Sequence, residues 1–375
     1  MRVLHVFDHS LPIVSEYSRR GIQFIKEQRR QGIETIQVTG VDHDLPFEAI
    51  EEVDGIEFHR CKKSHNLISK LPVFKQKMSV NILQKKIEEI VVTESIDIIH
   101  AHSPSINGLA ALKVGQKYKV PVHYDVRSFI ENDIYVMEQA TYITAASDAL
   151  KADMIERGID GDKIAVIPDF IDMEEYQERF EPNKDLQERM NILGMTIIGY
   201  VGPFDEVEGV DILIRSMRSL LFRVPNACLL LVGSGPEQDE LIQLAERMML
   251  GDRVILTGEV PHHKLIDYYN LIDIMVYGRR SVKKTEIEPF IKVLTAQAMK
   301  KNVIASDIGG HREFIKDGKT GLLFKPGDPI ALADKIVNFI EKPKRYCDAA
   351  IDNLLQKHDI KKTVKKYRDI YQNEL

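Results

Sequence analysis

The chain lacks tryptophan and is poor in cysteine. Of its 375 residues only Cys61, Cys228 and Cys347 are cysteines, and they are widely spaced. Such spacing excludes the disulfide framework of a small secreted domain, so we expect free thiols in a reducing cytosol. No apolar run approaches the roughly 20 residues that span a bilayer. No signal-peptide pattern precedes the first apolar run, VLHVF, and we therefore expect a cytoplasmic protein.

An excess of one charge is also missing. The chain has 51 Lys and Arg against 57 Asp and Glu, a net charge of -6. This balance gives no basic surplus for nucleic acid, and we expect no nucleic-acid partner. With 44% hydrophobic and 29% charged residues, the composition is typical of globular proteins. The length is sufficient for two or three domains.

One segment, residues 59–86, departs from this balance. It holds eight cations and no acid, with apolar residues between them. Its cations are Arg60, Lys62, Lys63, Lys70, Lys75, Lys77, Lys85 and Lys86. A basic stretch with apolar side chains can rest on anionic lipid headgroups at the inner face of the plasma membrane. The alternative is a solvated loop followed by the start of a helix.

Short β-branched runs alternate with helical patterns along the chain, which predicts an α/β fold with parallel sheets. The predicted strands are Val3–Phe7, Thr35–Thr39, Ile96–His100, Val120–Tyr124 and Tyr142–Ala145 in the first half, and Thr196–Val201, Ala227–Val232, Arg253–Leu256, Ile272–Tyr277 and Val303–Ala305 in the second. Between the halves lies a charged, proline-containing interruption. We predict two doubly wound, Rossmann-like domains, 1–180 (joined by a C-terminal helix, 358–375) and 181–357, which bind ligand in a shared cleft.

Several well-known chemical motifs are absent. The chain has no G-x-S-x-G, C-x-x-C, H-E-x-x-H or phosphate-loop pattern. The loop around Gly202 lacks the G-x-G-x-x-G spacing of dinucleotide sites. Two D-x-D triplets, 42–44 and 160–162, match a metal-binding pattern, but such triplets arise by chance in an acid-rich chain. We predict no catalytic metal.

Polar residues follow two predicted strands of the first half. His102 lies just beyond the strand that ends at His100, and Arg127 lies beyond the next one. Side chains at the carboxyl ends of parallel strands project towards ligand in this architecture. His102 is a candidate hydrogen-bond donor or phosphate contact, whereas His100 fits a core position. Arg127 either binds an anion or holds its loop through Asp125.

The densest group of cations in the second half lies between residues 279 and 292. Its members are Arg279, Arg280, Lys283, Lys284 and Lys292, and the pair Gly309-Gly310 follows. Arginine and lysine can neutralise the charge that grows on a departing diphosphate, and glycines allow close approach of backbone N–H groups. The alternative is an exposed basic loop. This segment predicts a diphosphate site.

Nearly the whole chain resembles glycosyltransferase family 4, which has the GT-B fold. The matching phrases include VFDHSLP, IHAHSPSINGLAAL, VPVHYDVRSF, KIAVIPDFID, ASDIGGHRE and DGKTGLLF. Within the family, the chain is most similar to bacterial members linked to exopolysaccharide and exosortase gene neighbourhoods. The resemblance implies a nucleotide-sugar donor in the C-terminal domain, an acceptor in the N-terminal domain, retention of anomeric configuration, and neither metal nor cofactor.

Carried over by position, the resemblance assigns diphosphate contacts to Arg280 and Lys292 and a sugar-phosphate loop to Gly309 and Gly310. It places His102 and Arg127 on the acceptor side. Arg279 and Gly202 join the nucleotide-binding set.

The chain also departs from the family. Thr295 replaces a glutamate that accepts both ribose hydroxyls, and Glu286 or Glu288 is a candidate substitute. Glu16 stands where relatives carry a small residue, and a stretch after Phe129 is shortened.

These features predict a glycosyltransferase that moves a sugar from a UDP- or GDP-linked donor to a lipid-linked or saccharide acceptor. The departures leave a second hypothesis open. In it, the chain is a catalytically impaired relative that binds a sugar nucleotide or serves as the scaffold subunit of a transferase complex.

Overall fold

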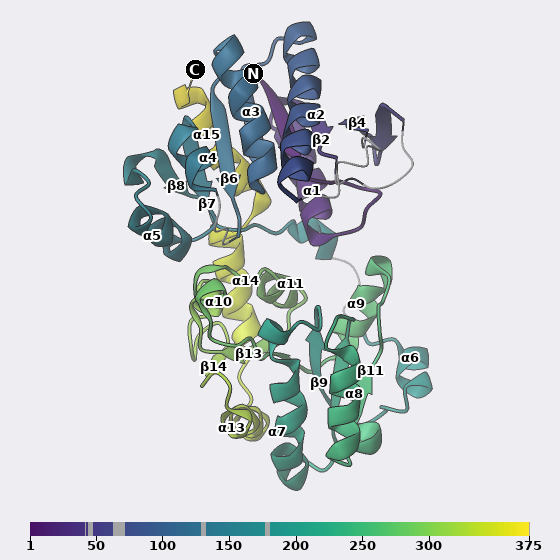
Figure 1. The fold of residues 1–375 in the computed structure, drawn as a ribbon. Coiled ribbons are helices and arrows are strands. Elements are labelled where there is room, and N and C mark those ends of the chain that lie inside the picture. Colours follow the sequence, from purple (N-terminus) through teal and green to yellow (C-terminus); the bar gives the residue numbers. More distant parts are fainter. Residues whose placement is uncertain (42, 44–47, 63–71, 129–132, 177–180, 375) are drawn as a thin grey trace. The chain divides into compact units, whose positions relative to one another are not determined.

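The computed structural model describes residues 1–41, 43, 48–62, 72–128, 133–176 and 181–374 (Figure 1). The chain forms two compact units. Unit 1 comprises Met1–Asp169 and Ile360–Leu375, and unit 2 comprises Phe170–Asp359. The division therefore falls earlier than the predicted boundary after residue 180. No helix of the described ranges is long and apolar enough to cross a membrane.

Unit 1 is built on a sheet with the strand order β3-β4-β2-β1-β5-β6-β7-β8 within the described residues. All neighbouring pairs are parallel except β3 and β4, which form an antiparallel edge. The strands are β1 (Arg2–Phe7), β2 (Glu34–Thr39), β3 (Ile50–Val53), β4 (Ile56–Arg60), β5 (Ile98–His102), β6 (Val122–Val126), β7 (Tyr142–Ala145) and β8 (Ile164–Val166).

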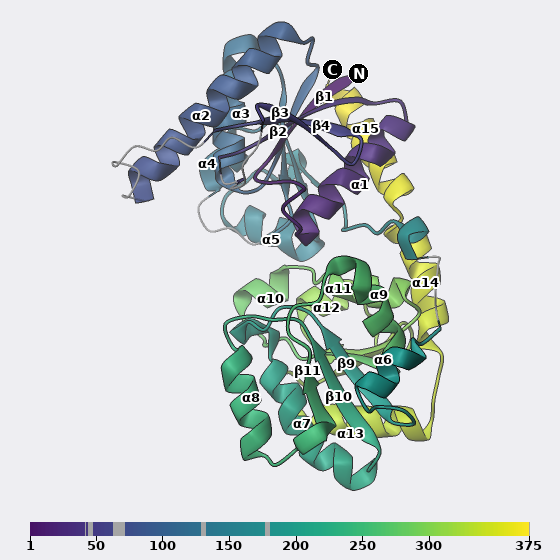
Figure 2. The ribbon, with the colours of Figure 1, turned by 90° about the vertical axis from the view of Figure 1, so that its right-hand side faces the viewer.

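Helices cover both faces of this sheet (Figure 2). They are α1 (Glu16–Arg30), α2 (Pro72–Thr93), α3 (Ser105–Tyr118), α4 (Ile134–Gln139), α5 (Asp148–Glu156) and α15 (Ile360–Glu374). Helix α1 begins at Ser15, whose hydroxyl accepts a hydrogen bond from the Ser18 N–H, and this N-cap fixes the start of the helix. Helix α15, the last of the chain, packs against α1. Segments far apart in sequence therefore cover the same face.

Unit 2 contains a parallel sheet with the order β11-β10-β9-β12-β13-β14 in its described part. Its strands are β9 (Thr196–Val201), β10 (Ala227–Val232), β11 (Val254–Leu256), β12 (Ile274–Tyr277), β13 (Asn302–Ser306) and β14 (Leu322–Phe324). Its α-helices are α6 (Lys184–Arg189), α7 (Val210–Arg223), α8 (Gln238–Arg247), α9 (His262–Leu271), α10 (Lys283–Ile287), α11 (Lys292–Ala298), α12 (Gly309–Arg312), α13 (Pro329–Glu341) and α14 (Tyr346–Lys357).

These two sheets confirm the predicted fold class of two Rossmann-like units. In unit 2, strand β10 is buried along its whole length and reads ACLLLV, as expected for a central strand with covered faces. The central strands of unit 1 are equally buried but much more polar, and β5 reads IIHAH. That difference in composition leads to the first candidate site.

Strands β5 and β6 end later than predicted. Each continues two residues further, to His102 and Val126. His102 and Asp125 face each other in register across the two strands, so both lie inside the sheet. The polar character of these positions hid the strand continuation, because we interpreted polar residues after an apolar run as a loop.

Candidate functional site

One face of the unit 1 sheet carries polar side chains where a buried parallel sheet usually carries aliphatic ones. Two rows of such residues cross neighbouring strands, and all their members are buried. The first row is His5, His100 and His123, and the second is His102, Asp125 and Thr144. Because alternate residues of a strand share a face, the phrases HVF, HAH and HYDVR place these side chains together.

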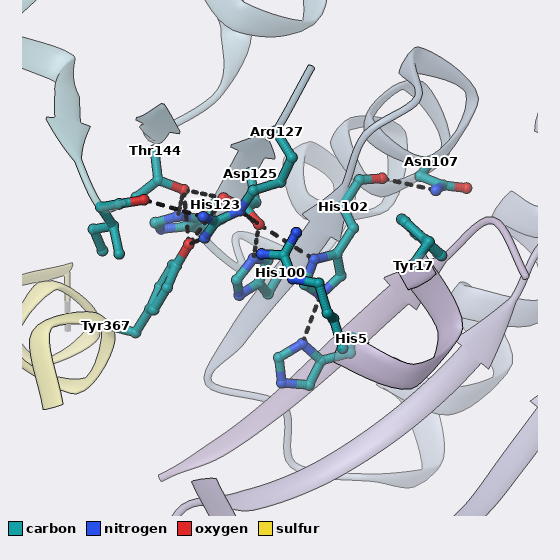
Figure 3. A network of polar contacts seen from close by, with 12 residues as sticks. His5, Tyr17, His100, His102, Asn107, His123, Asp125, Arg127, Thr144 and Tyr367 are labelled. Carbon is teal, nitrogen blue, oxygen red and sulfur yellow. Dashed lines mark hydrogen bonds and ion pairs between the residues drawn. The ribbon is translucent and has the colours of Figure 1, made fainter. Parts of the chain in front are cut away.

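Helices α1 and α15 supply the partners of these rows. Gln28 of α1 reaches the histidines, and so do Tyr367 and Tyr371, which lie one turn apart on α15. Figure 3 shows Tyr367 beside Asp125 and Thr144, and His5 beside His102. A polar sheet face is therefore matched by polar groups on the helices that cover it.

The histidines form a continuous hydrogen-bonded chain. His5 Nδ1 lies 3.1 Å from His102 Nε2, and His5 Nε2 lies 2.7 Å from Gln28 Oε1. His102 Nδ1 is 3.5 Å from Asp125 Oδ2. His100 Nδ1 is bonded to the Tyr371 hydroxyl. Burial lowers the pKa of His5, His100 and His102, so these rings are neutral at pH 7.

Arg127 is the charged partner of this cluster. Its Nε lies 2.9 Å from Asp125 Oδ2, and its Nη1 lies 3.0 Å from the Ile167 carbonyl oxygen and 3.2 Å from Asp169 Oδ1. Its Nη2 donates to the Tyr367 hydroxyl. Burial alone would raise the pKa of Asp125. The charge of Arg127 and the bonds from the neighbouring histidines outweigh burial and hold that pKa well below its ordinary value.

The histidine cluster has the composition of a metal site but not the geometry. One nitrogen from each of His5, His100 and His102 lies within 4.8 Å of the others. The rings of His100 and His102 are stacked, however, with centroids 4.2 Å apart and planes 18° apart. Imidazole lone pairs lie in the ring plane, so stacked rings direct them along parallel lines and not to one point. We assign no ion to the cluster.

The D-x-D triplets add no support for a metal. Asp160 accepts a hydrogen bond from the Asp162 N–H and caps a short 3-10 helix, Gly161–Lys163. Asp42 and Asp44 lie outside the described residues. Independence of a metal therefore stays a prediction.

The structure corrects the expected position of His102 and confirms that of Arg127. We expected both beyond the ends of their strands, and Arg127 directly follows β6. His102 is in strand β5, only 8% exposed, and both its ring nitrogens face protein groups. Arg127 directs all three nitrogens of its guanidinium to unit 1. Of its two predicted roles, the geometry favours the structural one.

In unit 2 a buried ion pair lies just after strands β9 and β12. Arg279 Nε is 3.2 Å from Glu208 Oε1, and each side chain is 5% exposed. The guanidinium carbon of Arg279 lies 4.4 Å from the ring centre of Phe290. Its Nη1 has no hydrogen-bond partner among the described residues. Burial raises the pKa of Glu208, and the charges of Arg279 and Lys292 oppose that rise.

The predicted cations therefore separate into two groups. Arg279 and Lys292 act on the same carboxylate, that of Glu208. Arg280 points elsewhere, with Nη2 2.7 Å from Asp211 Oδ1 and Nε 3.0 Å from the Glu206 carbonyl oxygen. No sequence pattern predicted that Arg279 and Arg280, adjacent in the chain, would contact different carboxylates.

The Gly309-Gly310 pair packs against backbone. A Cβ on Gly309 would lie 1.9 Å from the Glu286 carbonyl oxygen, and one on Gly310 would lie 2.2 Å from that of Glu288. The Gly309 N–H donates to the Glu286 carboxylate at 2.7 Å, and Ser281 Oγ donates to the same carboxylate at 2.6 Å. The Glu286 carboxylate therefore accepts the hydrogen bond from the Gly309 N–H, which we predicted to bind a phosphate.

The remaining predicted residues are Lys292, Thr295 and Gly202. Lys292 and Thr295 are one turn apart on α11 and partly exposed, whereas the residues between and after them are buried. Gly202 follows β9, and its N–H donates to the Val232 carbonyl oxygen at 3.0 Å. Gly202 thus extends the sheet ladder and does not offer its N–H to a ligand.

Sequence reasoning missed several members of these clusters. His5, Gln28 and Tyr371 complete the hydrogen bonds of unit 1, and Glu208 neutralises the cations of unit 2. The signal for His5 was present in the alternation of VLHVF. The tyrosines come from a helix more than 200 residues away in sequence, and no local pattern predicts that contact.

Comparison with known proteins assigns both units. Residues 183–354 match the family model described as glycosyl transferases group 1, and residues 19–175 match that of glycosyltransferase family 4. N-acetyl-alpha-D-glucosaminyl L-malate synthase of Bacillus anthracis is 24% identical over 95% of this chain and 93% of its own length.

Two solved structures share the fold over the whole chain. The Anabaena protein Alr3699/HepE, solved with UDP, has a TM-score of 0.79 at 18% identity, with 100% of both chains covered. Sucrose-phosphate synthase of Thermosynechococcus elongatus has a TM-score of 0.78 at 18% identity, covering 100% of this chain and 99% of its own. With one glycosyltransferase model matched in each unit and GT-B neighbours over its full length, the chain is a glycosyltransferase of the family 4 type.

Proposed function

We propose that this glycosyltransferase takes its sugar from a UDP- or GDP-linked donor bound by unit 2. The acceptor would be a lipid-linked or saccharide hydroxyl in the assembly of bacterial polysaccharide or glycoconjugate. The observation that supports donor binding most strongly is Arg279, a buried guanidinium whose Nη1 has no hydrogen-bond partner in the described part of the chain. Lys292 acts with it on the carboxylate of Glu208. The solved relative that holds UDP supports the class of donor.

The proposed reaction retains anomeric configuration and uses no metal. As the bond from sugar to diphosphate breaks, negative charge grows on the leaving group, and Arg279 and Lys292 stabilise it. The departing diphosphate helps to deprotonate the acceptor hydroxyl on the same face. We assign no covalent nucleophile. Arg280 can contact the diphosphate only if its ion pair with Asp211 breaks.

Calorimetric titration with UDP, GDP and ADP tests the donor site. Lys292→Ala should weaken the affinity for the preferred diphosphate roughly tenfold or more, since a charged hydrogen bond contributes about 1.5–3 kcal/mol. Arg280→Ala should weaken it less, because the Arg280 guanidinium is already bonded to Asp211 and to a backbone carbonyl. Unchanged affinity in Lys292→Ala would remove that residue from the site.

A second candidate function is sugar-nucleotide binding without transfer, as a scaffold or regulatory subunit. Three features favour it. Thr295 cannot replace a bidentate carboxylate at the ribose, Glu208 already neutralises Arg279, and Glu286 holds the Gly309 N–H. A donor hydrolysis assay with candidate lipid acceptors separates the two functions. Release of nucleoside diphosphate supports the transferase, and binding without release supports the scaffold.

We further propose peripheral contact with an anionic membrane through helix α2. Lys75, Lys77 and Lys85 are exposed on this helix. Arg60 does not contribute, because its side chain is fully buried and paired with Glu51. Lys63 and Lys70 lie outside the described residues.

Co-sedimentation with vesicles tests this contact. Vesicles of phosphatidylglycerol should retain the protein at low salt, and those of phosphatidylcholine should not. Equal retention by both would contradict the proposal.

A further inference from the structure

Besides the direct bond from Tyr367 to Asp125, a longer line of hydrogen bonds joins the C-terminal helix to strand β6. It runs from the Tyr371 hydroxyl to the Gln28 amide (3.3 Å), to His5 (2.7 Å), to His102 (3.1 Å) and to Asp125 (3.5 Å). Each link needs one proton between its two atoms. Counting these protons decides which nitrogen of each histidine carries hydrogen, and hence the direction of the line.

The count starts at Asp125. An ionised carboxylate only accepts hydrogen bonds, so the His102 nitrogen that faces it, Nδ1, carries hydrogen. A neutral His102 then has a lone pair on Nε2, which faces His5 Nδ1. His5 Nδ1 must carry hydrogen in turn, and the lone pair of His5 falls on Nε2.

The hydrogen bond between His5 and Gln28 determines the orientation of the Gln28 amide. A lone pair on His5 Nε2 requires a donor, which is the amide nitrogen. The structure has Gln28 Oε1 at this position and Nε2 toward Tyr371. A half-turn of the amide exchanges the two atoms in place and leaves its oxygen to accept from the Tyr371 hydroxyl. His100 Nδ1 then donates to that hydroxyl. His100 Nε2 carries the lone pair; it lies 3.9 Å from Asp125 Oδ2, beyond hydrogen-bond distance, and has no hydrogen-bond partner among the described residues.

The amide orientation drawn in the structure has a different consequence. If Gln28 Oε1 accepts from His5, the line is one proton short and an imidazolium must form at His5 or His102. The charged groups that face the cluster already balance, because Arg127 and Arg20 are paired with Asp125 and Asp169. An additional positive charge on a buried histidine would have no carboxylate left to pair with, whereas the amide half-turn leaves the histidine rings neutral.

We propose that Asp125, His5 and Gln28 are positioning residues that hold His102 as a neutral ring protonated on Nδ1. Every hydrogen bond of the line is then donated in the direction of Asp125, and the first donor is the Tyr371 hydroxyl of helix α15. His102 then presents neither charge nor a free donor to a phosphate, so the charge that binds diphosphate comes from unit 2. Only this last consequence rests on the proposed function.

Nitrogen-15 NMR of the histidine-labelled full chain tests the assignment without any activity assay. Two-bond proton–nitrogen patterns distinguish the Nδ1–H form, the Nε2–H form and the imidazolium. At pH 7.5 we expect the Nδ1–H pattern for His5 and His102. An Nε2–H or imidazolium pattern for His102 would overturn the proposal, and a failed transfer assay would not affect it.

The substitution Gln28→Glu replaces the donor at His5 Nε2 by an acceptor, and the new side chain has nearly the same shape as glutamine. The new carboxylate can only accept, so the His5–His102 pair must take up a proton. We expect an imidazolium pattern at pH 7.5 in this variant but not in the exposed control Gln116→Glu. Neutral rings in Gln28→Glu, identical to those of the unsubstituted chain, would contradict the proposed direction.

Discussion

At the scale of single residues, unit 1 buries His5, His100 and His102, and burial lowers the pKa of each ring. The unfolded chain therefore binds more protons than the folded one below the ordinary histidine pKa of about 6.5. The contribution of the neutral rings to the free energy of unfolding is complete above about pH 6.5 and is lost as the pH falls below that value. Protonation of these rings should therefore reduce the free energy of unfolding as the pH falls from 7.5 to 5.5.

Urea unfolding at these two pH values measures the effect. His100→Asn should make this loss smaller, because one of the buried rings is removed. The exposed control His263→Asn should leave the loss unchanged. Equal pH dependence in His100→Asn and the unsubstituted chain would show that the buried ring does not titrate as described.

The sequence predicted residue positions better than residue partners. His102, Arg127 and Arg279 each lie at or near the carboxyl end of a strand, because parallel strands place the residues that follow them at one edge. Their contacts depend on tertiary packing. The partner of Arg279, for example, is Glu208 from the neighbouring strand-to-helix turn.

At the scale of elements, Arg127 joins three segments: strand β6, the stretch after β8 and helix α15. Arg127→Ala would leave the carboxylates of Asp125 and Asp169 buried with weaker compensation. We expect a loss of about 3–5 kcal/mol in the free energy of unfolding. Arg215→Ala, which breaks an exposed pair with Asp211, should cost about 0.3–0.5 kcal/mol. A stable Arg127→Ala chain without transfer activity would favour a ligand-binding role.

The contact between α10 and α12 gives a second prediction at this scale. The Glu286 carboxylate accepts from the Gly309 N–H and from Ser281 Oγ, donors that also suit a phosphate. Removal of this competing anion in Glu286→Ala should strengthen nucleoside diphosphate binding several-fold. Glu240→Ala, on the exposed side of α8, is the control. Weaker binding in Glu286→Ala would instead support our sequence hypothesis that Glu286 replaces the missing ribose contact.

Element boundaries show where sequence reasoning is limited. The extents predicted for β9 and β10 are those observed, because each is an apolar run that a glycine follows directly. The ends of β5 and β6 were placed too early, since their last two residues include His102 and Asp125, buried polar groups that face each other across the sheet. The pattern of burial in such a strand depends on its partners, which the sequence alone does not identify.

At the scale of the whole molecule, two units of the same architecture differ in where they place charge. Unit 1 pairs the charges of Asp125, Arg127 and Asp169 within its own core. Unit 2 holds Arg279, whose Nη1 has no hydrogen-bond partner among the residues that the structure describes, and Lys292 acts on the same carboxylate of Glu208. The cations available for a diphosphate are therefore expected in unit 2.

Titration of the full chain with UDP-, GDP- and ADP-sugars, followed by detection of released nucleoside diphosphate, tests this account most directly. We predict that one donor binds, that Lys292→Ala weakens its binding at least tenfold, and that a hydroxyl acceptor stimulates diphosphate release. Failure of every donor to bind, or equal binding by the Lys292→Ala chain, would contradict the account.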